Sequence, residues 1–279
     1  MPLQAEREAR HFRSMKQPTF FLPHGGGPCF FLDEDGPVPP EWRPMGEFLA
    51  RAIADLPERP NAILIVSGHW EEPHFTVHNG ERPELLYDYG GFPDHTYALR
   101  WDAPGAPALA DRAAALLEAA GFPTTTEGDR GWDHGVFIPM KVAVPQADIP
   151  TVQLSLRRDL DPAAHIAAGR ALAPLRDEGV LIVGSGMSFH NMRLRDGSVQ
   201  EAADAFDAAL TAAVTDPDPA ARDASLAAWE RLPHARLAHP REEHLLPLMV
   251  AAGAASDDPG THIFRDRVIG WTVSGYRFG

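Results

Sequence analysis

Two apolar runs without polar alternation constrain the fold of this chain most strongly. They are NAILIVSG at residues 61–68 and VLIVGSG at residues 180–186, both rich in β-branched and aliphatic side chains. Such runs are typical of strands that are buried on both faces, as the central strands of parallel sheets are. Helices must therefore cover both faces of the sheet that contains them.

The rest of the chain alternates between strand and helix patterns. Further strands are expected at residues 18–22, 74–79, 122–127, 149–156, 261–267 and 270–278. Helices are expected at residues 44–56, 107–121, 136–145, 161–179, 199–215, 218–231 and 241–252. This spacing predicts a single α/β domain over residues 18–279, with a central, mostly parallel mixed sheet and helices on both faces. The last two strands are expected to add an antiparallel edge to that sheet.

The formal charge of −14 argues against the function classes that need a cationic surface. Binding to nucleic acid or to an anionic membrane requires clustered Lys and Arg side chains. Residues 1–17 form a polar tail without the apolar core of a signal peptide, and no apolar run approaches the ~20 residues that span a bilayer. We therefore expect a cytoplasmic protein without nucleic-acid or membrane partners.

The single cysteine, Cys29, allows no disulfide within the chain, which fits a reducing compartment. Cys29 lies shortly after His24 in the segment PHGGGPC, so a thiolate metal ligand is one interpretation. A small, buried apolar side chain is the interpretation that we favour.

Four histidines stand at or close to the ends of apolar segments. His24 follows FFLP, His69 follows ILIVSG, His190 follows LIVGSGMSF and His244 lies in REEHLLPLM. Three of them follow strand-like runs, and parallel strands bring their carboxyl ends to one rim of the sheet. Neutral imidazole is the commonest protein ligand of transition metals. The sequence therefore predicts a metal site at this rim.

A fifth histidine, His134, lies in the sequence GWDHG, which is typical of a rigid loop over a pocket. Its neighbour Asp133 is a candidate to orient it. The other histidines outside the loop GGFPDHTY are interpreted as solvated side chains, namely His11, His74, His78, His165, His234, His239 and His262. The glycines after His24 lack the spacing and the lysine of a phosphate-binding loop, so they indicate a tight turn.

Seven motifs recur in this chain in the order of a known family. They are PHGGGP, SGHW, LYDYGGFPDHTYALRWDAPGAPALA, GWDHGVFIPM, DIPTVQLSL, LIVGSGMSFHN and EEHLLPL. Over residues 18–279 the chain resembles the class III extradiol ring-cleavage dioxygenases, in the DOPA-dioxygenase-type, single-chain branch of the LigB-like superfamily. The resemblance implies a single α/β domain that opens a catechol beside its two hydroxyls, using O₂ and non-haem Fe(II). Members of the family are also described with Zn(II) bound.

The resemblance also implies roles for individual residues. By motif match, His24, His69, His190 and His244 take the metal-ligand positions, and His134 takes the position of an active-site histidine. The candidates for the walls of a pocket around an aromatic substrate are Phe92, Pro93, Tyr97 and Trp132, although ordinary loop packing explains each of them equally well.

The chain departs from the family pattern at two places where substrate is expected to touch. It has PHGGGP where the family often has GHGSP, and Arg100-Trp101-Asp102 where relatives often carry a tyrosine-proline pair. The identity of the substrate is therefore the least determined part of the resemblance.

Coordination chemistry suggests which histidines bind the metal and which act as acids or bases. A bidentate catecholate and O₂ occupy three positions of octahedral iron, which leaves three for protein ligands. We hypothesise that His24, His69 and His244 stay bound, while His190 is a labile ligand or the base that deprotonates the substrate. His134 is expected to be a second acid/base and hydrogen-bond donor.

Two other function classes stay open from the residues. A zinc hydrolase also uses an open histidine site, with Glu243 or Asp133 as the general base, although the HExxH signature is absent. A non-catalytic metal-binding protein on the same fold is the second alternative.

Overall fold

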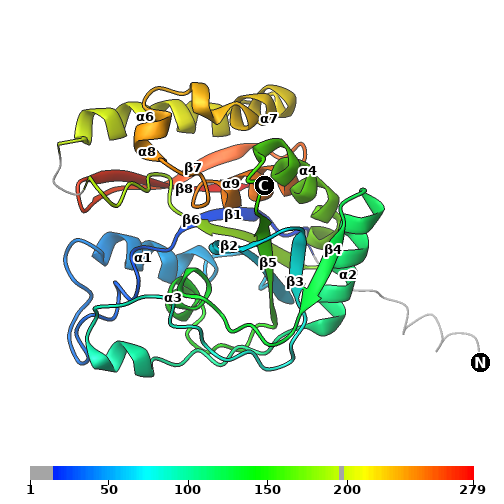
Figure 1. Ribbon diagram of the computed structural model, residues 1–279, viewed down its shortest axis with the longest axis horizontal. Coiled ribbons are helices and arrows are strands. Elements are labelled where there is room, and N and C mark those ends of the chain that lie inside the picture. Colours follow the sequence, from blue (N-terminus) through cyan, green and yellow to red (C-terminus); the bar gives the residue numbers. More distant parts are fainter. Residues whose placement is uncertain (1–14, 195–197) are drawn as a thin grey trace, which may run out of the picture.

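One mixed sheet forms the centre of the molecule (Figure 1). The computed structural model describes residues 15–194 and 198–279. Residues 1–14 of the predicted polar tail lie outside the described residues. Within these residues eight strands form one sheet in the order β4-β3-β5-β2-β6-β1-β8-β7. Their bounds are β1 (Thr19–Pro23), β2 (Ala62–Glu72), β3 (Phe75–His78), β4 (Thr124–Glu127), β5 (Thr151–Arg157), β6 (Val180–Gly186), β7 (Gly260–Val268) and β8 (Trp271–Phe278).

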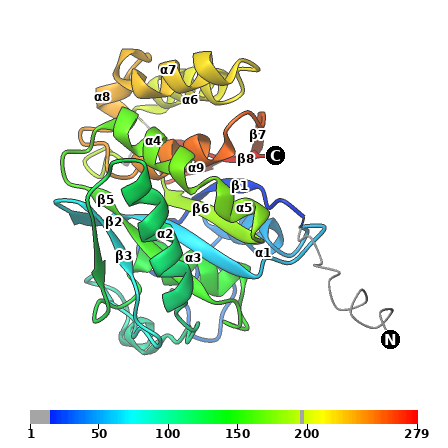
Figure 2. The same cartoon turned by 90° about the vertical axis from the view of Figure 1, so that its right-hand side faces the viewer.

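Helices cover both faces of this sheet, as the sequence predicts (Figures 1 and 2). On one face α3 contacts β2 and β6 and packs against α1, whereas α9 and α4 pack together on the other face, with α2 beside them. The helices are α1 (Arg43–Ala52), α2 (Pro107–Ala119), α3 (His134–Ala143), α4 (Pro162–Leu172), α5 (Pro174–Asp177), α6 (Gln200–Val214), α7 (Pro219–Ala227), α8 (Ala235–Ala238) and α9 (Leu246–Ala255). Among the described residues, no helix is both long enough and apolar enough to cross a bilayer.

The two non-alternating runs lie in the middle of the sheet. β6 pairs in parallel with β1 and β2, and β2 pairs in parallel with β5. The aliphatic side chains of Ile63–Val66 and Val180–Val183 are buried, which is why these strands need no polar face. At the edge, β8 runs antiparallel to β1 and β7 runs antiparallel to β8, so the predicted antiparallel edge is confirmed.

Two expected helices end or begin elsewhere because of proline. Asp161 caps α4 by accepting a hydrogen bond from the backbone of Ala163, as predicted, but the helix expected to reach residue 179 breaks at Ala173. Pro174, which lacks the N–H that would continue α4, begins the short helix α5. In the same way α9 begins at Leu246 with Pro247 in its first turn, so His244 lies in a turn before the helix and not inside it.

Three histidines that the sequence indicated as solvated are in fact buried. They are His78, His165 and His239. The ring of His165 donates from Nδ1 to the Asp161 carbonyl at 2.7 Å and accepts at Nε2 from the Arg157 N–H at 3.1 Å. Buried polar groups are usually hydrogen-bonded, and a histidine that connects backbone groups in this way satisfies that rule without water. Of the other four, His74 and His234 are exposed, His262 is half-buried and His11 lies outside the described residues.

Candidate metal centre and active site

Five histidines meet at the rim formed by the carboxyl ends of β1, β2 and β6. His24 directly follows β1, His69 comes from β2, and His190 follows β6. His134 begins α3, and His244 lies in the turn before α9. All five line one cavity of about 600 Å³. The structure therefore brings together every histidine to which the sequence gave a role in the site.

His69 does not end its strand, although the sequence predicted that it would. β2 continues to Glu72, and its register against β5 shifts between Val66 and Glu71. This irregularity lies at the position of His69 and interrupts the ladder there. The side chain consequently reaches the cavity from within the strand.

The imidazole rings of His24, His69 and His244 form a nearly equilateral triangle. The ring centroid of His24 lies 5.0 Å from that of His69 and 5.1 Å from that of His244, and the centroids of His69 and His244 lie 4.7 Å apart. The His134 centroid lies 3.9 Å from that of His69, and the ring of His190 stacks on that of His244 at 3.5 Å. One ring nitrogen from each of His24, His69 and His134 lies within 4.8 Å of the other two, and one ligand atom from each of His190, Glu243 and His244 forms a second such group.

Two carboxylates hold four of these rings from behind. Asp88 accepts a hydrogen bond from His134 Nδ1 at 2.8 Å, and its other oxygen lies 3.5 Å from His69 Nδ1. Glu243 accepts from His244 Nδ1 at 2.9 Å and lies 3.4 Å from His190 Nδ1. A carboxylate behind a ligand histidine fixes the ring orientation and raises the basicity of the other nitrogen.

The positions of these carboxylates determine where the ring protons lie. Ionised Asp88 and Glu243 can only accept hydrogen bonds, so we assign the proton of each facing ring to Nδ1. The Nε2 atoms of His69 and His244 then both carry lone pairs, and they face each other across 3.2 Å. Neither Nδ1 nor Nε2 of buried His24 has a hydrogen-bond partner in the structure. Two opposed lone pairs and an unpartnered imidazole fit a cation between these rings.

The pKa values of the groups agree with this assignment. Burial, followed by the neighbouring histidines, holds the pKa of His24, His69 and His244 well below the ordinary value, so these rings are neutral. Burial alone would raise the pKa of Asp88 and of Glu243. For Asp88 the hydrogen bonds and the charge of His134 together outweigh burial and lower the pKa. For Glu243 the contributions of His190, its own backbone N–H and Arg241 outweigh burial and lower the pKa. Neutral rings backed by ionised carboxylates are the protonation states that metal binding requires.

The two Ser-Gly pairs in the central strands explain how distant turns reach the rim. Ser67 and Ser185 hold the turn that carries His134: the first donates to Asp133 and the second donates to the Gly135 carbonyl. A Cβ atom at Gly186 would lie 2.1 Å from the His244 carbonyl oxygen, so only glycine lets that turn approach β6. The repeated dipeptide is therefore part of how His134 and His244 are positioned.

Three residues named in alternative interpretations have other roles. Cys29 lines the cavity, but burial raises the pKa of its thiol, and it belongs to neither group of potential metal ligands among the described residues. Asp133 does not orient His134. It is buried and accepts from Ser67, Gln153 and Arg130. Glu243 contacts two histidines. Both candidate bases for a hydrolase, Asp133 and Glu243, therefore already have partners.

Of the four predicted pocket walls, only Phe92 lines the cavity. Pro93 is exposed, and Tyr97 packs against the ring of Tyr89, which does line it. Trp132 is buried elsewhere, against the ring of His78 at 4.8 Å, because its backbone bridges to Leu85. Sequence reasoning missed Asp88 as a histidine partner and missed the walls Trp42, Tyr89, Met187 and Trp271.

Comparison with known families identifies this arrangement. Residues 18–278 match the model of the catalytic LigB subunit of aromatic ring-opening dioxygenase. The chain belongs to the LigB family. This agrees with the resemblance drawn from the motifs and makes the protein an oxidoreductase, an extradiol ring-cleaving dioxygenase.

Relatives cover nearly the whole LigB-family chain. It is 38% identical over 285 residues to dioxygenase tasH of Hapsidospora irregularis, a match that spans 94% of this chain and 85% of the relative. It is 37% identical to a 4,5-DOPA dioxygenase extradiol of Beta vulgaris, over 93% of this chain and 96% of the relative. The crystal structure of an uncharacterized Escherichia coli K12 protein shares the fold with a TM-score of 0.74 and 30% identity, covering 94% of this chain and 100% of that one.

Proposed function

We propose that this LigB-family enzyme opens a catechol-type aromatic diol beside its two hydroxyls, with Fe(II) as the active metal and O₂ as the oxidant. The observation that carries the proposal is the pair of facing Nε2 lone pairs on His69 and His244, with the unpartnered ring of His24 beside them. Zn(II) suits the same neutral nitrogen ligands and is a second metal that the site can hold. We expect the protein to act in the cytoplasm.

In this proposal His24, His69 and His244 hold the metal through ring nitrogens. When bound, the metal supplies a redox-active Lewis acid at which the diol and O₂ meet. The protein contributes the orientation of the three rings and the apolar cavity around them. Asp88 and Glu243 keep the ring protons on Nδ1 and so keep Nε2 available.

His190 is proposed as the base that takes a proton from the diol. Its ring stacks on that of His244, and its Nδ1 faces Glu243 at 3.4 Å, so its Nε2 is the atom left to accept a proton. The ionised carboxylate of Glu243 would stabilise the imidazolium that forms. His190 lies in the segment after β6, which leaves it more room to move than His69 has inside β2.

His134 is proposed as a second acid/base and hydrogen-bond donor. Its Nδ1 and its backbone N–H both donate to Asp88, which fixes the ring at the start of α3. The ring centroid of His134 lies 3.9 Å from that of His69, so it stands beside the proposed metal ligands. Changing His134→Asn should lower turnover by about 10²-fold, the scale usual for a positioned acid or base, while the catechol still binds.

The decisive experiment is anaerobic reconstitution with Fe(II) followed by a panel of catechols. We expect O₂ consumption and an absorbing, yellow ring-opened product with at least one diol. The same protein loaded with Zn(II) serves as the control and should bind the diol without consuming O₂. Hydrolysis of an ester without O₂ uptake would favour the zinc-hydrolase alternative, and tight metal binding without any diol binding would favour a non-catalytic role.

The division of labour among the histidines is tested by a matched pair of substitutions. His190→Ala should retain iron, measured by metal analysis, and lose ring cleavage, because only the base is removed. His244→Ala should lose iron itself. If His190→Ala lost iron and His244→Ala kept it, the two assignments would be exchanged.

A further inference from the structure

The cavity that holds the histidines has apolar walls. Beyond the histidines and the glycine turn, its surface includes Trp42, Tyr89, Phe92, Met187, Ile269 and Trp271. Among the described residues, no Lys, Arg, Asp or Glu side chain lines this cavity. A bound diol therefore meets ring faces and aliphatic groups once its two hydroxyls have reached the histidines.

Several polar groups in these walls have partners of their own. The hydroxyl of Tyr89 donates to the Thr96 carbonyl at 2.6 Å, and the indole N–H of Trp271 donates to the Leu194 carbonyl. The Cys29 thiol is kept protonated because burial raises its pKa. These walls consequently offer little that could replace the hydration of a charged substituent.

Two arginines behind the histidines are already neutralised. Arg130 donates to the His69 carbonyl and pairs with Asp133 at 3.1 Å. Arg241 forms two hydrogen bonds with Glu71 and also contacts Glu243. Neither arginine lines the cavity, so neither is placed to bind a substrate carboxylate.

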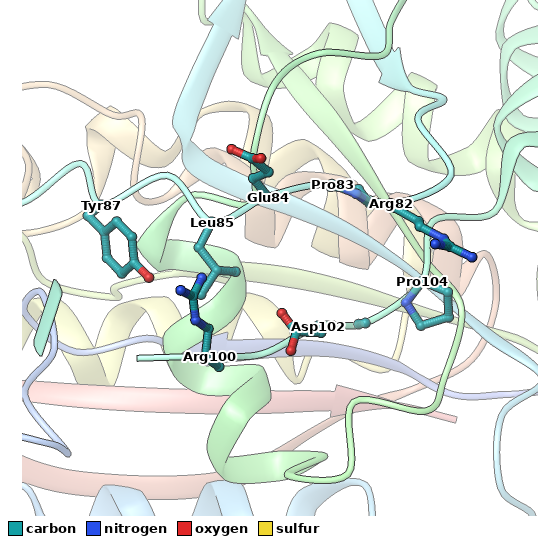
Figure 3. Close-up of a pocket in the computed structure, with 9 residues that line it drawn as sticks. Arg82, Pro83, Glu84, Leu85, Tyr87, Arg100, Asp102 and Pro104 are labelled. Carbon is teal, nitrogen blue, oxygen red and sulfur yellow. The ribbon is translucent and has the colours of Figure 1, made fainter. Parts of the chain in front are cut away.

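Four charged residues of the loop after β3 line a different cavity. Figure 3 shows residues that line this cavity, among them Arg82, Glu84, Arg100 and Asp102. Its volume is about 490 Å³. Two of these, Arg100 and Asp102, belong to the segment that departs from the family pattern and was expected to touch substrate. The structure places their side chains on this second cavity, while Trp101 between them is buried and donates to the Val144 carbonyl.

From these observations we propose that the preferred substrate is a catechol whose ring substituent is apolar and uncharged, in contrast to an amino acid such as DOPA. The proposal rests on the proposed function. A free ammonium or carboxylate that leaves water without a partner loses its hydration, and each such group should lower kcat/KM by about 10-fold or more. An apolar chain of the same length gains from the same walls.

The experiment compares four catechols that carry three-carbon side chains at the same ring position. They are 4-propylcatechol, 3-(3,4-dihydroxyphenyl)propionate, 3-(3,4-dihydroxyphenyl)propylamine and L-DOPA. With the Fe(II)-loaded enzyme, we expect the highest kcat/KM for 4-propylcatechol, about 10-fold or more lower values for the two singly charged compounds, and the lowest for L-DOPA. Anaerobic titrations followed by tryptophan fluorescence should give dissociation constants in the same order.

A higher kcat/KM for L-DOPA than for 4-propylcatechol would overturn the substrate assignment and leave the proposed function intact. If none of the four compounds were cleaved or bound, the proposed function itself would be wrong and the assignment would fall with it. Arg100→Gln provides the internal control, because its side chain faces the other cavity. The ratio of kcat/KM between L-DOPA and 4-propylcatechol should not change in this variant, and a selective loss for L-DOPA would also overturn the assignment.

Discussion

His24 and His165 are both fully buried histidines, yet their surroundings differ in one decisive respect. Both nitrogens of His165 meet backbone groups, at 2.7 Å and 3.1 Å, whereas both nitrogens of His24 have no hydrogen-bond partner. Burial lowers the pKa of each ring. Burial and a lowered pKa therefore do not distinguish a structural histidine from a candidate ligand. Unpartnered ring nitrogens are not sufficient either, because buried His78 also lacks partners and packs against the ring of Trp132. What sets His24 apart is that its unpartnered ring lies beside the rings of His69 and His244.

The same contrast separates the two regions in which these histidines lie. At His165 the polypeptide satisfies the ring completely, and the contact ties the start of α4 to the end of β5. At the rim the rings of His24, His69 and His244 turn lone pairs toward one another, which costs free energy unless a cation lies between them. One region contributes to stability by itself, and the other contributes when a metal binds.

The largest effect expected from this contrast is on metal binding. His24→Ala should weaken metal binding by more than the 10- to 100-fold that is typical for loss of an outer-shell partner, because a proposed ligand itself is removed. His165→Gln is the matched control and should bind metal as the parent protein does while unfolding at a lower temperature. Metal content after dialysis, together with thermal unfolding in the presence and absence of a chelator, measures both effects. Equal metal loss in the two variants would show that burial alone had been mistaken for coordination.

The stability of the protein in acid should depend on His165. Burial lowers the pKa of His165 to about 4, from an ordinary value of 6.5, so the unfolded chain binds the proton first as the pH falls. The contribution of neutral His165 to the free energy of unfolding is fully present above pH 6.5 and is lost as the pH falls toward 4. At about 1.4 kcal/mol per pH unit, the loss amounts to about 3 kcal/mol.

Urea unfolding of metal-free protein at several pH values between 7 and 4 tests this expectation. His165→Gln should be less stable than the parent at pH 7, and the difference between the two proteins should shrink as the pH is lowered. His74→Gln, at an exposed position, should follow the parent curve. A constant difference across the whole pH range would mean that His165 titrates in the folded state as it does in the unfolded one.

The carboxylates behind the rings should have a smaller effect than the ligands. Asp88→Asn keeps an acceptor for His134 but removes the charge that holds the proton on Nδ1, so metal affinity should fall by about 10- to 100-fold. Asp133→Asn is the control, because Asp133 supports the same turn without lining the cavity. It should lower stability and change metal affinity less. Competition with a chromophoric chelator gives both affinities.

The sequence predicted which histidines gather at the rim but not the carboxylates behind them, for a physical reason. The strands 61–68 and 180–186 are continuous apolar runs, and the side chains that follow them must appear at the same rim. Asp88 stands in a loop without periodicity, and it meets His134 from 46 positions away in the chain. Such a contact depends on how the loop packs, which no local pattern encodes.

The same reason explains the histidines and the pocket walls that were placed wrongly. His165 lies in a helix segment rich in alanine, and nothing in its neighbours indicates that the backbone of Arg157 reaches its ring. Trp132 adjoins the segment of His134, but a backbone bridge to Leu85 turns it away from the cavity. Trp271 begins the last strand, far from any motif histidine in the sequence, and still forms part of the wall because β8 pairs with β1.

The smallest effect should come from Arg241, the only charged partner of Glu243 among the described residues that is not a histidine. Half of the Arg241 side chain is exposed, and its contact with Glu243 is 3.5 Å, longer than the 2.9 Å contact of His244. Exposed ion pairs contribute about 0–1 kcal/mol and are screened by salt, so Arg241→Gln should change metal affinity and unfolding free energy by less than about 1 kcal/mol. Isothermal titration with Zn(II) at low and high salt measures the difference. A loss of metal affinity as large as that of Asp88→Asn would mean that Arg241 holds Glu243 in place. Glu243 would then depend on an arginine for its position, whereas Asp88 does not.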